Sequence, residues 1–125
     1  MRIVYFFHRD QQLAELYRRL FEDAGFRFRQ ATERQACMTL LEDESPHCII
    51  MSLLVDRAIG FGFLEELLNR FDRNIPIVVY TKLSEREDVR RSRSLGCSGY
   101  FIESQTKPEE LLKTVQTLSV EAVPV

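Results

Sequence analysis

The sequence has few cysteines, no long hydrophobic run and no excess of charge of one sign. Its three cysteines are odd in number and far apart, with no C-x-x-C spacing, which argues against a disulfide framework or a zinc site. Cys37, Cys48 and Cys97 are instead expected to be small core residues. The net charge is −2 and no run of Lys and Arg makes a basic stripe, so nothing attracts the chain generally to nucleic acid.

The longest uncharged stretch, Pro46 to Val55, is far shorter than the ~20 apolar residues of a membrane-spanning helix. The first residues lack the basic region, apolar region and cleavage site of a signal peptide, so we expect a cytoplasmic protein without membrane contact. Hydrophobic residues make up 45% and charged residues 29% of 125, which predicts a single folded domain. We place it at residues 1–119, followed by a short tail, 120–125.

Five short segments read as strands. Ile3–Phe7, Cys48–Met51 and Ile75–Tyr80 are apolar and rich in β-branched or aromatic residues, a pattern typical of strands buried on both faces. Phe26–Arg29 alternates apolar and charged side chains, as a strand with one solvated face does. Gly99–Ile102 is the fifth candidate, and the last two segments suit the edges of a sheet.

Between these strands the apolar residues recur at helical spacing. The clearest stripe precedes Gly25, a natural stop for a helix, and consists of Leu13, Leu16, Leu20, Phe21 and Ala24. Capping boxes, in which Ser or Thr is followed three residues later by Gln or Glu, predict further helix starts at Thr32–Gln35, Ser84–Glu87 and Thr106–Glu109. The remaining helix carries Phe61, Leu64, Leu67, Leu68 and Phe71.

Strict alternation of strands and helices predicts a parallel sheet with helices on both faces, a doubly wound α/β domain. In such sheets function concentrates at the carboxyl ends of the strands. The residues at those ends are the candidate site: His8, Arg9, Asp10, Ser52, Thr81 and Glu103.

With these elements in order, the sequence resembles the receiver domain of bacterial two-component response regulators, which have a flavodoxin-like fold with strand order 2-1-3-4-5. Val4 to Phe26 aligns without a gap on the family's first strand and helix. Pro46 to Met51 and Ile75 to Thr81 resemble its third and fourth strands. Gly60 falls on a family glycine, and Leu95-Gly96 with Gly99-Tyr100 resemble the approach to the fifth strand.

The resemblance also shows where the chain departs from the family. Two adjacent acidic residues that hold Mg²⁺ in receivers correspond to His8 and Arg9, and the phosphorylated aspartate corresponds to Ser52. The phosphate-binding lysine corresponds to Glu103, while Thr81 keeps the family's hydroxyl. A family pocket holds three carboxylates and one ammonium, whereas Arg9 and Glu103 balance here, so we expect no Mg²⁺ site, no cofactor and no phosphoryl transfer. We expect Arg9 and Glu103 to form a solvent-facing pair worth ~0–1 kcal/mol.

Two alternatives use the same residues. Asp10 and Asp56 could form a relocated acidic site, although an Asp at a helix start favours an N-cap. Ser52 and a partly exposed His8, with either aspartate, could form a hydrolase triad, but Leu53 and its neighbours replace the G-x-S-x-G elbow of serine hydrolases. The loop from His8 to Gln12 is also unlike a phosphate cradle for a flavin.

Arginines at 86, 90, 91 and 93 alternate with acidic residues, which favours a solvated, salt-bridged face over a nucleic-acid patch. The resemblance implies that this helix, the strand Gly99–Ile102 and the last helix bind protein partners or a second copy, with Arg90, Arg91 and Tyr100 on that surface. Tyr100 matches the family's switch aromatic, which turns inward when Thr81 engages phosphate; as an edge residue it would keep a wet hydroxyl. We therefore predict a receiver-like module that acts through protein contacts.

Overall fold

The computed structural model describes residues 1–55, 59–71 and 74–119, so the predicted tail and Asp56 lie outside it. All five predicted strands are present and pair in parallel, in the order β2-β1-β3-β4-β5. Their bounds are β1 Arg2–Phe7, β2 Phe26–Ala31, β3 Cys48–Met51, β4 Ile77–Thr81 and β5 Gly99–Ile102. The predicted fold class, strand order and edge positions of β2 and β5 are confirmed.

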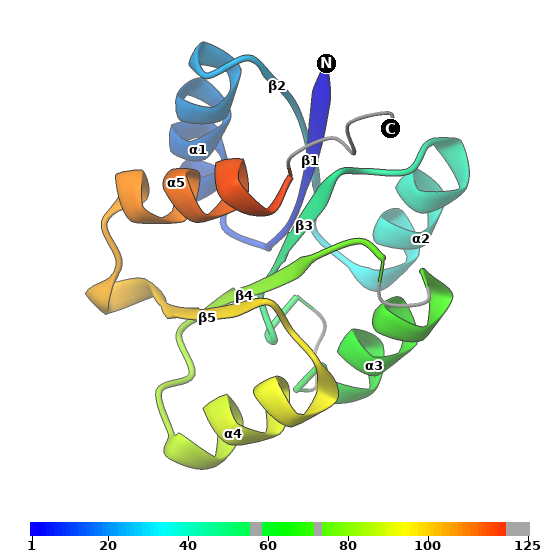
Figure 1. Ribbon diagram of the computed structural model, residues 1–125, viewed down its shortest axis with the longest axis vertical. Helices are drawn as coiled ribbons and strands as arrows, with labels where there is room; N and C mark the ends of the chain where they lie inside the picture. Colours follow the sequence, from blue (N-terminus) through cyan, green and yellow to red (C-terminus); the bar gives the residue numbers. More distant parts are fainter. Residues whose placement is uncertain (56–58, 72–73, 120–125) are drawn as a thin grey trace, which may run out of the picture.

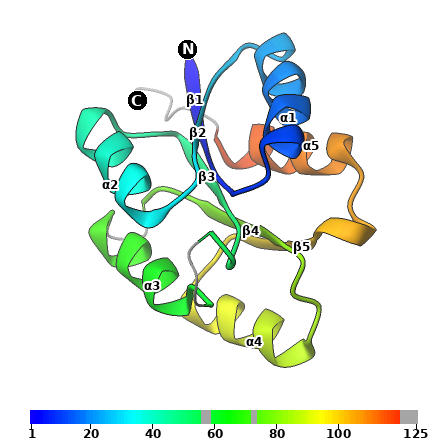
Figure 2. The same cartoon turned by 180° about the vertical axis from the view of Figure 1, so that it is seen from behind.

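Helices cover both faces of this sheet. Figures 1 and 2 show α1 and α5 side by side on one face and α2, α3 and α4 on the other. Their bounds are α1 Gln11–Asp23, α2 Arg34–Asp43, α3 Phe61–Arg70, α4 Arg86–Leu95 and α5 Pro108–Leu118, with a 3-10 turn at Glu103–Gln105. Among the described residues, no helix is long and apolar enough to cross a membrane.

The sheet separates two hydrophobic clusters because alternate strand residues point to opposite faces. Tyr5 and Phe7 of β1 point toward α2 and α3, whereas Val4 and Phe6 point toward α1 and α5. Cys48 belongs to the second cluster, and burial raises the pKa of its thiol to about 12. Such a thiol is an inert core residue, as predicted.

Two local predictions about the helices hold only in part: most of the predicted α1 stripe packs on the core, and α2, α4 and α5 begin within the segments that the capping boxes mark. Phe21 of the predicted stripe is buried and Leu13, Leu20 and Ala24 pack against the core, but Leu16 is 48% exposed. Ala14 and Tyr17 complete the buried face of α1. The aromatic rings turn to the sheet because they can stack there: Tyr17 lies 5.5 Å from Phe6 between ring centroids. None of the three capping boxes forms; α2, α4 and α5 begin after Glu33, Glu85 and Lys107, without a side-chain cap.

Helix α4 is held to the body by unusually little apolar surface. Its one fully buried residue is Ser92, whose Oγ has no hydrogen-bond partner within the described part of the chain. We expect Ser92→Ala to raise the free energy of unfolding by about 1–2 kcal/mol, because it removes an unsatisfied buried hydroxyl and favours the helix. Urea denaturation of the wild type and the variant measures this change in the free energy of unfolding.

The matched control is Ser94→Ala, which changes an exposed serine of the same helix. Helix propensity alone should then raise stability by no more than about 0.5 kcal/mol. If Ser92→Ala gained no more than Ser94→Ala, the Ser92 hydroxyl would have a partner after all.

Candidate functional site

A pocket of about 480 Å³ opens at the carboxyl ends of β1, β3, β4 and β5. The structure brings five of the six candidate residues to its wall, and the sixth, Thr81, lies buried next to Ser52. Its lining is His8, Arg9, Asp10, Ser52, Leu54, Lys82 and Glu103. Lys82 was missed because the predicted fourth strand ended at Tyr80; with the strand ending at Thr81, Lys82 is the residue that follows it.

His8 and Glu103 form a direct bridge across this pocket. The distance from His8 Nε2 to Glu103 Oε2 is 2.9 Å, and the two side chains are only 7% and 12% exposed. His8 Nδ1 accepts a hydrogen bond from the backbone N–H of Asp10 at 3.1 Å, so the ring proton is on Nε2 and is donated to the carboxylate. The His8 ring thus donates a hydrogen bond to a carboxylate that is mostly shielded from solvent.

This bridge corrects two predictions. His8 is buried rather than partly exposed, and its ring stacks on Phe6 with centroids 5.2 Å apart. Glu103 pairs with His8 rather than with Arg9, which is exposed on the rim. The reason is local geometry: β1 ends at Phe7, and the His8 backbone is still tied to β2, with its N–H donating to the Ala31 carbonyl at 3.0 Å.

Asp10 is an N-cap, as predicted. Its Oδ1 accepts a hydrogen bond from the Leu13 N–H at 3.0 Å, in the first turn of α1. The positive end of the helix dipole stabilises the carboxylate there. A relocated acidic site would therefore have to share Asp10 with the cap, and its other member, Asp56, is outside the described residues.

Ser52 and Thr81 form the hydroxyl pair of the site. Their side-chain oxygens are 3.4 Å apart, and Ser52 Oγ accepts a hydrogen bond from the Leu54 N–H at 3.0 Å. Both ring nitrogens of His8 are already bonded, to Glu103 and to Asp10. Because no nitrogen of His8 is left to take the Ser52 proton, the arrangement does not fit the hydrolase triad.

The described residues of the pocket do not fit a divalent cation such as Mg²⁺, which needs several oxygen ligands. The carboxylate of Asp10 caps α1, that of Glu103 accepts the His8 proton, and Arg9 and Lys82 add positive charge to the wall. Across residues 1–55, 59–71 and 74–119, no group of three or more His, Cys, Asp or Glu side chains is placed to hold a metal.

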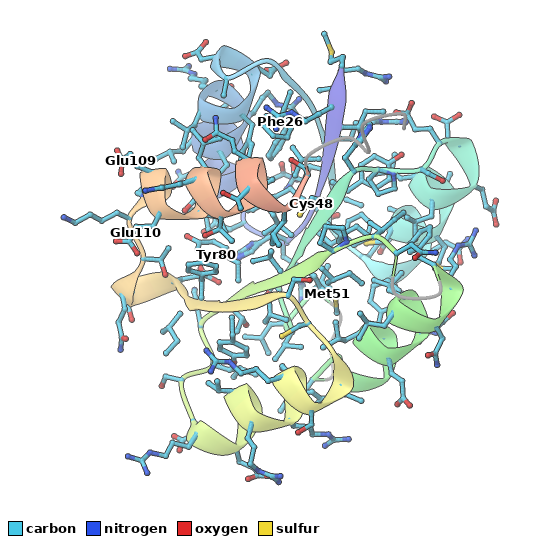
Figure 3. The ribbon with its side chains drawn as sticks, in the orientation of Figure 1. Phe26, Cys48, Met51, Tyr80, Glu109 and Glu110 are labelled. Carbon is cyan, nitrogen blue, oxygen red and sulfur yellow. The ribbon has the colours of Figure 1, made fainter. Side chains whose placement is uncertain are left out.

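Two hydrogen-bonded tyrosines adjoin the pocket, since the ring of Tyr80 lies 6.0 Å from that of His8 between centroids. Tyr17 donates its hydroxyl hydrogen to the hydroxyl of Tyr80 at 3.1 Å, and Tyr80 lies between α5 and the sheet (Figure 3). Burial first, and then this hydrogen bond, keep the pKa of Tyr17 far above its usual value. Burial also raises the pKa of Tyr80. Both hydroxyls stay protonated, so this tyrosine pair places no negative charge next to the pocket.

The predicted interaction residues differ from one another in their contacts. Tyr100 is half-buried and donates its hydroxyl to the Leu83 carbonyl at 2.8 Å, so the hydroxyl is not wet. Burial, then Asp88 and Cys97, raise the pKa of Tyr100 to about 12. Arg90 Nε donates to Glu87 at 3.0 Å, as expected of a salt-bridged face. Arg91 instead lies over the ring of Phe61 in α3, 4.3 Å from its centroid.

Comparisons with solved structures give the fold. Chemotaxis protein CheY4 of Vibrio cholerae superposes with a TM-score of 0.82 at 20% identity, covering 94% of this chain and 98% of that one. A response regulator from Burkholderia pseudomallei, solved with a phosphorylated aspartic acid and a calcium ion, superposes with a TM-score of 0.82 at 18% identity, covering 95% and 69%.

Sequence comparisons give the family. Two probable transcriptional regulators ycf27, from Porphyridium aerugineum and Cyanophora paradoxa, are 23% and 24% identical over 94 residues. These residues are 75% of this chain but only 38% of either relative. The sequence model of the family described as response regulator receiver domain matches residues 8–116 of this chain. That match spans most of the sequence, and the sheet has the strand order 2-1-3-4-5 of receiver domains. The chain therefore belongs to the response regulator receiver domain family.

Proposed function

We propose that this chain is a receiver-type signalling module that does not take up a phosphoryl group and acts through contact with a protein partner. The observation that carries the proposal is the buried bridge between His8 and Glu103. It occupies the wall of the pocket in which a receiver would need free carboxylates and a metal.

The charge of the pocket supports the same proposal. Arg9 and Lys82 balance Asp10 and Glu103, and both carboxylates are engaged in contacts of their own. Phosphoryl transfer depends on positioned positive charge that neutralises the transferred group, and on a nucleophile able to attack it. Both ring nitrogens of His8 are engaged and cannot take the Ser52 proton, and a serine hydroxyl that is not activated by a base is a poor nucleophile.

The surface formed by α4, β5 and α5 is where we place the partner, with dimerisation as a second use of the same surface. The hydrogen bond from Tyr100 to the Leu83 carbonyl ties β5 to the loop before α4, so these elements present one connected surface.

We further propose that residues 1–119 form one module. No disulfide joins its described cysteines, which fits the cytoplasm.

The test is to titrate Mg²⁺ and beryllofluoride while following amide chemical shifts, and to measure intact mass after incubation with acetyl phosphate. We expect no saturable shift at Thr81 or Ser52 and no added mass. The Burkholderia pseudomallei regulator, which carries a phosphorylated aspartic acid in its structure, is the positive control. Saturating shifts around Thr81, or a phosphorylated chain, would refute the proposal.

A further inference from the structure

A groove of about 560 Å³ runs along the outer side of α4, which lies at the edge of the molecule in Figures 1 and 2. It is lined by Ser84, Arg86, Val89, Arg90, Arg93 and Ser94. Arg86, Arg90 and Arg93 are spaced by four and three residues, which places their side chains on one face of the helix.

Two of the three arginines of this groove, Arg86 and Arg93, carry positive charge that no described acidic side chain neutralises. Arg90 pairs with Glu87, but within the described part of the chain neither Arg86 nor Arg93 forms an ion pair. Like charges at this spacing destabilise a helix. Arg91 differs, because its guanidinium lies over Phe61 and belongs to the contact between α3 and α4.

We propose that this groove binds an acidic helical segment of a partner protein, whose carboxylates meet Arg86 and Arg93, the two arginines that lie on either side of the paired Arg90. The inference rests on the proposed function and names the chemistry of the partner. Guanidinium groups bind carboxylates through paired hydrogen bonds, and a helix alongside α4 would present acidic residues three and four positions apart.

Nucleic acid fits this groove less well. Glu85, Glu87 and Asp88 lie in the same stretch of chain, and the net charge of the sequence is −2. Phosphate backbones are bound by basic patches that extend along a whole face or helix, whereas these three arginines occupy two turns of α4. The flanking carboxylates would repel a continuous row of phosphates.

A second copy of this chain also fits less well. The exposed acidic pair in the first turn of α5 is Glu109 and Glu110, and both point away from the body of the protein (Figure 3). They are adjacent in sequence, so their side chains diverge by ~100° around the helix. They cannot both face arginines that are four and three residues apart.

The test measures fluorescence anisotropy of a labelled, alanine-based peptide of ~20 residues, long enough to form a helix, with three glutamates on one face. A peptide of the same composition with its glutamates distributed around the helix is the control ligand. We expect the aligned peptide to bind, and Arg86→Ala combined with Arg93→Ala to weaken binding by about tenfold or more. Higher salt should weaken it as well.

Arg19→Ala combined with Arg70→Ala is the matched control variant, because it removes two exposed arginines from α1 and α3 and leaves the groove intact. The affinity of this control variant for the aligned peptide should stay within about twofold of the wild-type affinity. Arg86→Lys with Arg93→Lys keeps the charge but loses the paired hydrogen bonds, and should bind between the wild type and the alanine variant. Circular dichroism verifies that each variant is folded.

Three results would overturn the inference: equal binding of both peptides, no effect of the groove substitutions, or tighter binding of a single-stranded DNA of equal charge. Self-association of the free chain that the groove substitutions abolish would assign the groove to a second copy and overturn it too. Acetyl phosphate labelling of the same samples keeps the two proposals separate, because it tests the proposed function whether or not the peptide binds.

Discussion

Replacing His8 by alanine is expected to lower the free energy of unfolding by about 3 kcal/mol, because it leaves the carboxylate of Glu103 buried without its donor. The side chain of Glu103 is only 12% exposed, so water cannot fully replace the imidazole. The loss of the ring that stacks on Phe6 adds to the effect. Urea denaturation at neutral pH measures the change.

A double-mutant cycle separates the bridge from the packing. We expect His8→Ala combined with Glu103→Ala to be less destabilised than the sum of the single variants, with a coupling free energy of about 2 kcal/mol. Glu103→Gln is the conservative control, because its amide oxygen can still accept the His8 Nε2 proton. Strictly additive single effects would show that the two side chains do not stabilise each other.

The second large effect concerns phosphorylation. We expect Ser52→Asp alone to remain unlabelled by acetyl phosphate in the presence of Mg²⁺, as judged by intact mass. An aspartate at this position supplies one carboxylate, but Glu103 stays bonded to His8 and Arg9 stays on the rim. The metal therefore still lacks ligands, and the charge of the transferred group is not neutralised.

The matched variant restores the other positions of the family pattern together with the aspartate. It carries His8→Asp, Arg9→Asp, Ser52→Asp and Glu103→Lys. We expect this variant to gain the mass of one phosphoryl group, with labelling that requires Mg²⁺. Strong labelling of Ser52→Asp with Arg9 intact would show that the balance of charge in the pocket does not control the chemistry.

Most of the fold follows from patterns that are local in the sequence. The buried strands were recognisable from apolar runs such as Cys48–Met51, whose bounds are the same in the structure. Helix faces and starts were less predictable. Leu16 has the right spacing for the core, but packing of Tyr17 and Phe21 against the sheet decides which face is buried. Thr106 has the right type for a cap, but its hydroxyl donates instead to the Ile102 carbonyl at 2.7 Å.

The composition of the site was predictable, but its pairing was not. Ends of parallel strands meet at one edge, so His8, Ser52 and Glu103 were expected to lie together. Which of them bond depends on how far each side chain reaches across the pocket, and His8 and Glu103 are 95 positions apart in the chain. Arg9 follows His8 directly, yet its side chain lies on the rim of the pocket. Which of these two neighbours reaches Glu103 is decided by the course of the backbone after β1.

The hydrogen-bonded pair of Tyr17 and Tyr80 provides an optical probe of the protein. The sequence has no tryptophan, so its near-ultraviolet absorption and emission come mainly from four tyrosines. Tyr17 bonds to Tyr80, whose ring packs near that of His8 in the pocket wall, and Tyr100 contacts the loop before α4. A molecule that rearranges either region therefore alters an intrinsic spectroscopic signal, and titrations of this protein can be followed without attaching a dye.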